Sequence, residues 1–140
     1  MSAQYDLIVI GSGTAGLTAG LFGARYGLRT LVLESLLPGG QIINAERIEN
    51  FPGFPKSVSG GEFAPMLMEQ TMAAGVGFQM AGATALRLND PYWIVVTDDG
   101  DYSAKAVILA MGSSLKKLGV PGEEKLRGRG VSTCATCDGP

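Results

Sequence analysis

The feature that most constrains this chain is a glycine-rich turn between two apolar segments. Residues 11–16 read Gly-Ser-Gly-Thr-Ala-Gly, which is the spacing G-x-G-x-x-G. The turn follows residues 5–10, a short apolar run rich in β-formers, and it precedes residues 17–24, where apolar side chains recur with helical spacing. A lone glycine triplet is a weak signal, but a position between a strand and a helix makes it meaningful.

Each glycine of the turn has a separate expected purpose. Gly11 allows the tight turn, and Gly13 lets the backbone approach a diphosphate without a Cβ in the way. Gly16 lets the helix pack closely on the strand. The helix start then offers backbone N–H groups and the positive end of its dipole to the phosphates. The sequence therefore predicts a phosphate-binding turn.

A second apolar run, residues 30–33, ends at Glu34, eighteen residues after Gly16. This completes a predicted β-α-β unit of about thirty residues, with the helix ending near Gly27. The Glu34 carboxylate can accept hydrogen bonds from an adenosine ribose diol and would repel a 2′-phosphate. The favoured ligand is therefore FAD or NAD(H) rather than NADP(H). The alternative is a glycine-rich turn beside a surface glutamate, without a ligand.

The remainder of the chain alternates between one long loop and short regular elements. Residues 37–61 carry repeated Pro and Gly and are expected to be a functional loop, and residues 62–74 have helical spacing. We expect short strands at residues 78–80, 84–88, 93–97, 102–103 and 106–110, with a hairpin turn at residues 98–100.

Composition excludes several classes of protein. With 46% hydrophobic and 17% charged residues, the 140-residue chain has the composition of one folded domain. A net charge of −2 makes nucleic acid a poor partner, and the absence of histidine removes serine triads and imidazole metal sites. No apolar run is long enough for a membrane span and no secretory signal is evident, so we expect a cytoplasmic protein.

Basic residues concentrate after Ser113, and two cysteines follow them. We interpret residues 116–129 as an exposed linker, with a docking patch as the alternative. Cys134 and Cys137 form C-x-x-C, a spacing that suits reversible disulfide exchange. Half of a metal site shared between two chains, or two unrelated cysteines, are the alternatives, and we expect no metal. Asp138 would raise a neighbouring thiol pKa and could serve as an acid–base group during exchange.

Taken together, these motifs resemble the amino-terminal part of bacterial-type (low molecular weight) thioredoxin reductases. The matching segments lie along nearly the whole chain: residues 11–16, Glu34, residues 39–41, 49–53, 110–112 and 130–139. The resemblance implies an α/β fold, a Rossmann-like FAD-binding domain of the ββα type with a central parallel sheet and a small β-meander layer, in truncated form. It also implies a division into an incomplete FAD-binding domain (residues 1–115) and a linker with the start of a pyridine-nucleotide domain (residues 116–140).

The resemblance further implies which residues hold FAD. The expected cofactor-binding residues are Gly11, Ser12, Gly13, Thr14, Ala15, Gly16, Glu34, Gly39, Gly40, Gln41, Asn50, Gly82, Ala83, Ala110, Met111 and Gly112. Of these, Gly40, Gln41 and Asn50 would lie along the ribityl chain and flavin ring. Thr14 stands where proline is common in the family, and Met111 where threonine is common.

The implied activity is that of an FAD-dependent thioredoxin-disulfide reductase. Electrons would pass from NADPH through FAD to the Cys134–Cys137 disulfide and then to thioredoxin or a thioredoxin-like disulfide. The resemblance also implies a homodimer. Cys137 would be the flavin-side thiol, Cys134 the thiol that attacks thioredoxin, and Asp138 their acid–base partner. G-x-G-x-x-G occurs once, so this chain offers no NADPH fingerprint. The alternatives are a non-catalytic FAD- or ADP-binding module and a related reductase with another electron donor.

Overall fold

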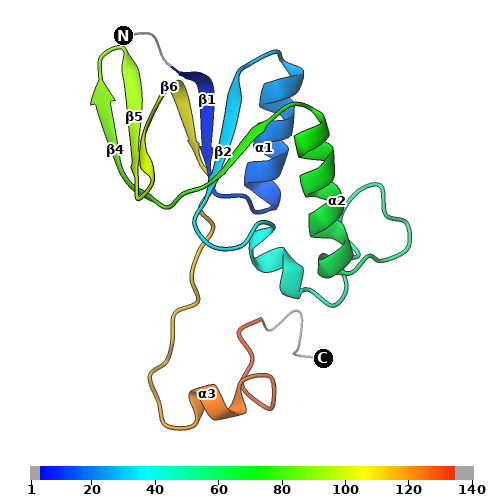
Figure 1. Ribbon diagram of the computed structural model, residues 1–140. Coiled ribbons are helices and arrows are strands. Elements are labelled where there is room, and N and C mark those ends of the chain that lie inside the picture. Colours follow the sequence, from blue (N-terminus) through cyan, green and yellow to red (C-terminus); the bar gives the residue numbers. More distant parts are fainter. Residues whose placement is uncertain (1–3, 135–140) are drawn as a thin grey trace.

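The computed structural model describes residues 4–134, which form a layered α/β domain followed by an extended segment (Figure 1). The elements, in chain order, are β1 (Tyr5–Ile10), α1 (Thr14–Arg25), β2 (Thr30–Glu34), the 3-10 helix η1 (Gly40–Asn44), α2 (Gly60–Ala73), β3 (Gly77–Met80), β4 (Ala83–Asn89), β5 (Tyr92–Thr97), β6 (Gly100–Leu109) and α3 (Glu123–Leu126). Within the described part of the chain, no helix is both long and apolar enough to cross a membrane.

All six strands belong to one sheet, in the order β3-β2-β1-β6-β5-β4. β1 lies at the centre of the parallel half, where Leu7 is opposite Thr30 of β2 and Ala106 of β6. β5 pairs antiparallel with the first half of β6, and β4 pairs antiparallel with β5 at the edge of the sheet. The predicted α/β class, with a central parallel sheet and a β-meander, is confirmed.

Side chains of β1 alternate between two buried faces, which explains why its residues 7–10 are all apolar. Leu7 and Val9 pack with Val32 of β2 and with residues of α1. α1 covers this face of the sheet (Figure 1). Ile8 and Ile10 face the opposite side, where they pack with Val95 of β5 and other meander residues. The meander is therefore a third layer over the parallel sheet, and it remains continuous with that sheet through β6.

Two predicted boundaries were wrong. Residues 102–103 and 106–110 were expected to be separate strands, but they belong to the single strand β6. The intervening residues do not interrupt the strand, because the Lys105 ammonium pairs with Asp6 and Ala104 is buried in the core. The helix expected at residues 62–74 begins at Gly60, because Ser59 and Glu62 form a capping box.

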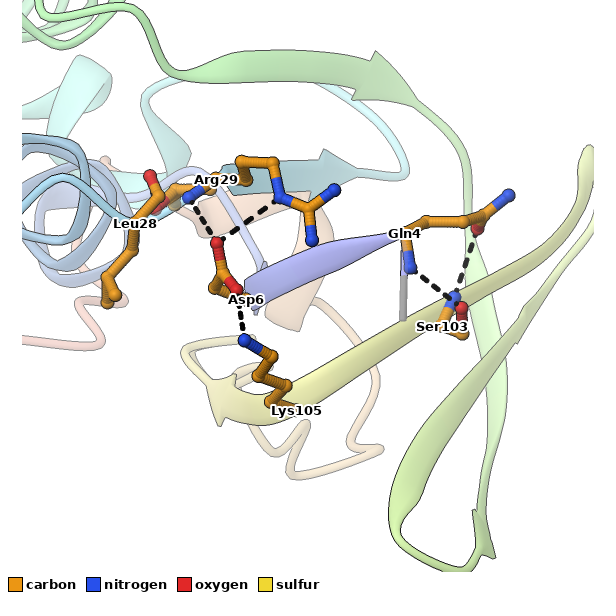
Figure 2. Close-up of polar contacts among 7 residues, drawn as sticks. Gln4, Asp6, Leu28, Arg29, Ser103 and Lys105 are labelled. Atoms are coloured by element: carbon orange, nitrogen blue, oxygen red, sulfur yellow. Dashed lines mark hydrogen bonds and ion pairs between the residues drawn. The ribbon is translucent and has the colours of Figure 1, made fainter. Parts of the chain in front are cut away.

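Asp6 links β1 to the residue that precedes β2 and to the middle of β6 (Figure 2). Its Oδ2 accepts hydrogen bonds from Arg29 N–H at 2.8 Å and from Arg29 Nε at 3.4 Å, and its Oδ1 lies 2.8 Å from Lys105 Nζ. Beside it, Gln4 and Ser103 exchange two hydrogen bonds of 3.1 Å. The Lys105 ammonium, with the Arg29 N–H, lowers the pKa of Asp6 to about 2. These contacts set the register of β1 against β2 and β6.

The long loop at residues 37–61 is tied to the helices rather than lying free of the domain. It contains η1, and Ile48 and Val58 form an isolated antiparallel bridge within it. Both side chains are buried against Leu17 of α1 and Phe63 of α2. The loop thereby covers the helical layer and brings η1 close to the glycine turn.

Candidate functional site

The glycine turn lies at the carboxyl end of β1, where ligands bind in open parallel sheets. Gly11 has φ of +102°, and its N–H donates to the Leu33 carbonyl at 2.8 Å. A Cβ on Gly16 would lie 1.8 Å from the Gly11 carbonyl oxygen, so only glycine permits this approach of helix to turn. A Cβ on Gly13, in contrast, would have Gly39 O at 4.0 Å as its nearest neighbour. Gly11 and Gly16 are therefore required by packing, whereas Gly13 leaves space open.

The start of α1 has no side-chain cap. Gly13 is its N-cap residue, and neither a capping hydrogen bond nor an acidic residue is present in its first turn. α2 differs, since Ser59 and Glu62 satisfy its first N–H groups. The first-turn residues Thr14 and Ala15 line a cavity of about 980 Å³. The α1 start therefore directs N–H groups and a positive dipole end toward that cavity.

Glu34 ends β2 directly beside the turn. Its Oε2 accepts hydrogen bonds from Ser12 Oγ at 2.6 Å and from Ser12 N–H at 2.8 Å. Its Oε1 accepts from the N–H groups of Ser35 and Leu36, both at 3.0 Å. Partial burial raises the pKa of Glu34, but these donors outweigh it and hold the net pKa below its ordinary value. The carboxylate is consequently ionised and fixed in orientation at neutral pH.

A third wall comes from the end of β6 and the segment that follows it. Ala110 N–H donates to the Ile10 carbonyl at 2.8 Å, which continues the sheet pairing to the edge of the turn. The Gln41 side-chain amide donates to the Ser113 carbonyl, so η1 contacts the start of the extended segment. This contact closes one side of the space between the turn and residues 110–115.

Two cationic side chains line the same space. Lys117 Nζ and Arg127 Nη2 both pair with Glu124 Oε1, at 2.7 Å and 3.3 Å respectively. Glu34 is the carboxylate of the lining, and Glu124 is not part of it. The charged groups around the cavity therefore include two cations as well as the carboxylate that β2 supplies.

These walls enclose a cavity of about 980 Å³, in the upper range of ligand sites. Its lining comprises Ile10, Gly11, Ser12, Gly13, Thr14, Ala15, Leu33, Glu34, Ser35, Leu36, Leu37, Gly39, Gly40, Gln41, Ile42, Asn44, Ala81, Ala83, Ala110, Met111, Gly112, Ser113, Ser114, Leu115, Lys117 and Arg127. An uncapped helix start, open space at Gly13 and a fixed carboxylate together fit the diphosphate and ribose of a dinucleotide.

Most sequence-predicted cofactor residues are brought together in this lining. They are Gly11, Ser12, Gly13, Thr14, Ala15, Glu34, Gly39, Gly40, Gln41, Ala83, Ala110, Met111 and Gly112. Gly16 lies behind the turn, as its packing requires. Asn50 lies instead in a separate shallow pocket formed by residues 49–55. Gly82 lies outside the lining, and its N–H donates to Asp98 Oδ1 at 2.8 Å.

Sequence reasoning missed several residues of the lining. Ser35 and Leu36 could have been expected, because they follow the carboxyl end of a parallel strand. Lys117 and Arg127 carried no local signal, since both lay in a stretch interpreted as an exposed linker. Their place at the cavity depends on how residues 110–127 run after β6.

The predicted redox residues fall at the end of the described chain. Cys134 is half-buried, and its N–H donates to Ser132 Oγ at 3.0 Å. Cys137 and Asp138 lie outside the described residues. Among residues 4–134, no group of three or more His, Cys, Asp or Glu side chains is arranged to hold a metal ion.

Comparison with known proteins yields consistent matches. The family described as "Pyridine nucleotide-disulphide oxidoreductase" matches residues 5–140. The chain is 43% identical to a thioredoxin reductase of Treponema pallidum, over 100% of this chain and 46% of that protein. It is 45% identical to a thioredoxin reductase of Mycolicibacterium smegmatis, over 96% of this chain and 43% of that protein.

A solved structure gives the same result. The thioredoxin reductase of Streptococcus pyogenes superimposes with a TM-score of 0.85 and 43% identity, covering 96% of this chain and 44% of that one. The chain therefore spans less than half the length of the relatives it matches.

Proposed function

Because the chain belongs to the pyridine nucleotide-disulphide oxidoreductase family, we propose that it is the FAD-binding part of a thioredoxin-disulfide reductase. The observation that carries this proposal is the uncapped start of α1, which opens beside Gly13 into the same cavity as the Glu34 carboxylate. The uncapped helix start supplies N–H groups for the diphosphate, and the Glu34 carboxylate supplies an acceptor for the ribose hydroxyls.

The proposed contacts of FAD follow from the cavity walls. The N–H groups at Gly13, Thr14 and Ala15 would hold the diphosphate, and residues 110–112 would close over it. Glu34 would accept the ribose hydroxyls. Ala83 and the backbone near Gly82 would meet the adenine.

The opposite end of the cavity would receive the flavin. Gly40 and Gln41 would lie along the ribityl chain and the flavin ring, and we extend this assignment to Asn50 on the resemblance alone. When bound, FAD supplies two-electron transfer between a nicotinamide donor and a disulfide. The chain's own contribution is to bind and orient it.

The cysteine pair would then act on a protein disulfide. The Cys134 thiolate attacks one partner sulfur, which breaks the partner S–S bond and releases a partner thiolate. The Cys137 thiolate next attacks Cys134 Sγ, forming the Cys134–Cys137 disulfide and releasing the second partner thiolate. Asp138 would deliver or remove the protons. The partner is reduced by two electrons and the pair is oxidised by two.

Further properties of the complete enzyme are part of the same proposal. The donor would be NADPH, the partner thioredoxin or a thioredoxin-like disulfide, the assembly a homodimer and the compartment the cytoplasm. Residues 1–115 would form the FAD-binding domain, and residues 116–140 the linker and the start of a pyridine-nucleotide domain.

Flavin reconstitution tests the proposal. We expect the purified protein to retain FAD after gel filtration, and dithiothreitol to bleach the bound flavin in the wild type. In Cys137→Ser the flavin should bind equally well but resist bleaching, because the flavin-side thiol is absent. Equal bleaching of both proteins would favour a passive binding module. A colourless protein after reconstitution would contradict the FAD assignment.

A further inference from the structure

The carboxylate of Glu34 is held by the chain itself before any ligand binds. An ionised carboxylate has about four lone-pair sites. Two on Oε2 receive the hydroxyl and the N–H of Ser12, at 2.6 Å and 2.8 Å. Two on Oε1 receive the N–H groups of Ser35 and Leu36, both at 3.0 Å. A ribose hydroxyl must therefore share or displace one of these donors.

The two oxygens are not held equally. The Ser12 hydroxyl makes the shortest of the four contacts, and Ser12 has no exposed surface. Its carbonyl also accepts a hydrogen bond from Gly39 N–H at 2.8 Å, which ties it to the loop after β2. Ser35 and Leu36 are exposed, and their contacts to Oε1 are longer. Oε1 is therefore the oxygen more open to a ligand.

Ser12 reaches the ligand through Glu34 rather than directly. Both residues line the cavity, but Ser12 has no exposed surface, whereas Glu34 is half-buried and open to a ligand. A rotating carboxylate would lose its alignment with a vicinal diol, so a buried anchor on one oxygen increases the selectivity of the other.

We infer that Ser12 is a positioning residue for sugar recognition: its hydroxyl anchors Glu34 Oε2 so that Oε1 receives the ribose 2′-hydroxyl. Ser12 thereby sets the preference for a ribonucleotide over a 2′-deoxyribonucleotide. This inference rests on the proposed function, because it requires the cavity to hold an adenosine diphosphate group.

The test compares ADP with 2′-deoxy-ADP by calorimetry. We expect the wild type to bind ADP about tenfold more tightly than 2′-deoxy-ADP, because the loss of one hydrogen bond to a charged group weakens binding by about that factor. In Ser12→Ala this ratio should fall to about twofold or less. Thr71→Val is the matched control, because it also removes a buried hydroxyl, but one that donates to Leu67 O and lies outside the cavity lining; it should keep the wild-type ratio.

A double-mutant cycle separates positioning from a purely structural role. Glu34→Gln should also lower the ratio, and adding Ser12→Ala to it should cause no further change. The acid limb of ADP binding should move to higher pH in Ser12→Ala, because loss of the hydroxyl donor raises the pKa of Glu34. If Ser12→Ala does not fold, Ser12→Cys keeps the size with a weaker donor and should lower the ratio in the same direction.

The outcomes are distinguishable. Wild-type selectivity retained in Ser12→Ala or Ser12→Cys would overturn the inference and leave the proposed function standing. Additive effects of Ser12→Ala and Glu34→Gln would also overturn it. A wild type that binds neither ADP nor FAD would overturn the proposed function, and the inference with it.

Discussion

Replacing Gly13 by alanine separates ligand binding from folding. The added Cβ would meet nothing closer than Gly39 O at 4.0 Å, and φ of −70° with ψ of −176° is open to any residue. Alanine is a poorer N-cap residue than glycine by about 0.5–1 kcal/mol. Alanine also makes the unfolded chain less flexible, which raises the unfolding free energy by about 0.4–1 kcal/mol. We therefore expect the unfolding free energy to change by less than about 1 kcal/mol.

Binding should change far more. The methyl group would stand where the diphosphate approaches the α1 start, and each lost hydrogen bond to a charged oxygen costs about 1.5–3 kcal/mol. The Kd for ADP should therefore rise by roughly 10- to 100-fold. Calorimetry measures the Kd, and urea unfolding measures the stability.

Gly61→Ala is the control for this substitution. Its added Cβ would also meet open space, and Gly61 lies on α2 outside the cavity lining. It should leave the Kd unchanged. If Gly13→Ala folds normally and binds ADP within twofold of the wild type, the assignment of the α1 start to the diphosphate is refuted.

Three further predictions concern the scaffold of the site. Gly16→Ala should destabilise the protein by about 3 kcal/mol or more in urea unfolding, because its Cβ would lie 1.8 Å from Gly11 O; a wild-type midpoint would contradict the packing argument. Thr71→Val should cost about 1 kcal/mol, because the buried hydroxyl donates to Leu67 O at 2.7 Å; a more stable variant would argue against it. Asp6→Asn should lower stability at pH 7 but converge with the wild type as pH falls from about 4 to 2, because the folded pKa of Asp6 is about 2, below its unfolded value of roughly 3.9. Parallel stability–pH curves for Asp6→Asn and the wild type would contradict that linkage.

Local sequence signals predicted the first part of the fold well. The apolar run at residues 5–10 predicted β1, and the glycine spacing predicted the turn and the start of α1. The apolar run that ends at Glu34 predicted β2. The family resemblance and the α/β class drawn from these motifs are confirmed. Each of these patterns involves residues close together in the sequence, so it can be recognised without knowledge of the fold.

Longer-range features were harder to predict. β6 was divided in two because the polar Lys105 interrupts its apolar pattern, and its partner Asp6 lies about a hundred residues earlier. The early start of α2 had a readable signal in Ser59 and Glu62, a capping-box spacing. The approach of Lys117 to the cavity depends on the path of the chain after β6, which no local pattern encodes.

The central claim is that the amino-terminal end of α1 binds the diphosphate of a dinucleotide. Backbone amide chemical shifts recorded during an FAD titration test it most directly. We predict that the largest changes occur at Gly13, Thr14 and Ala15, with the same saturation as the flavin signal. Saturable FAD binding that leaves these three amides unchanged would contradict the claim.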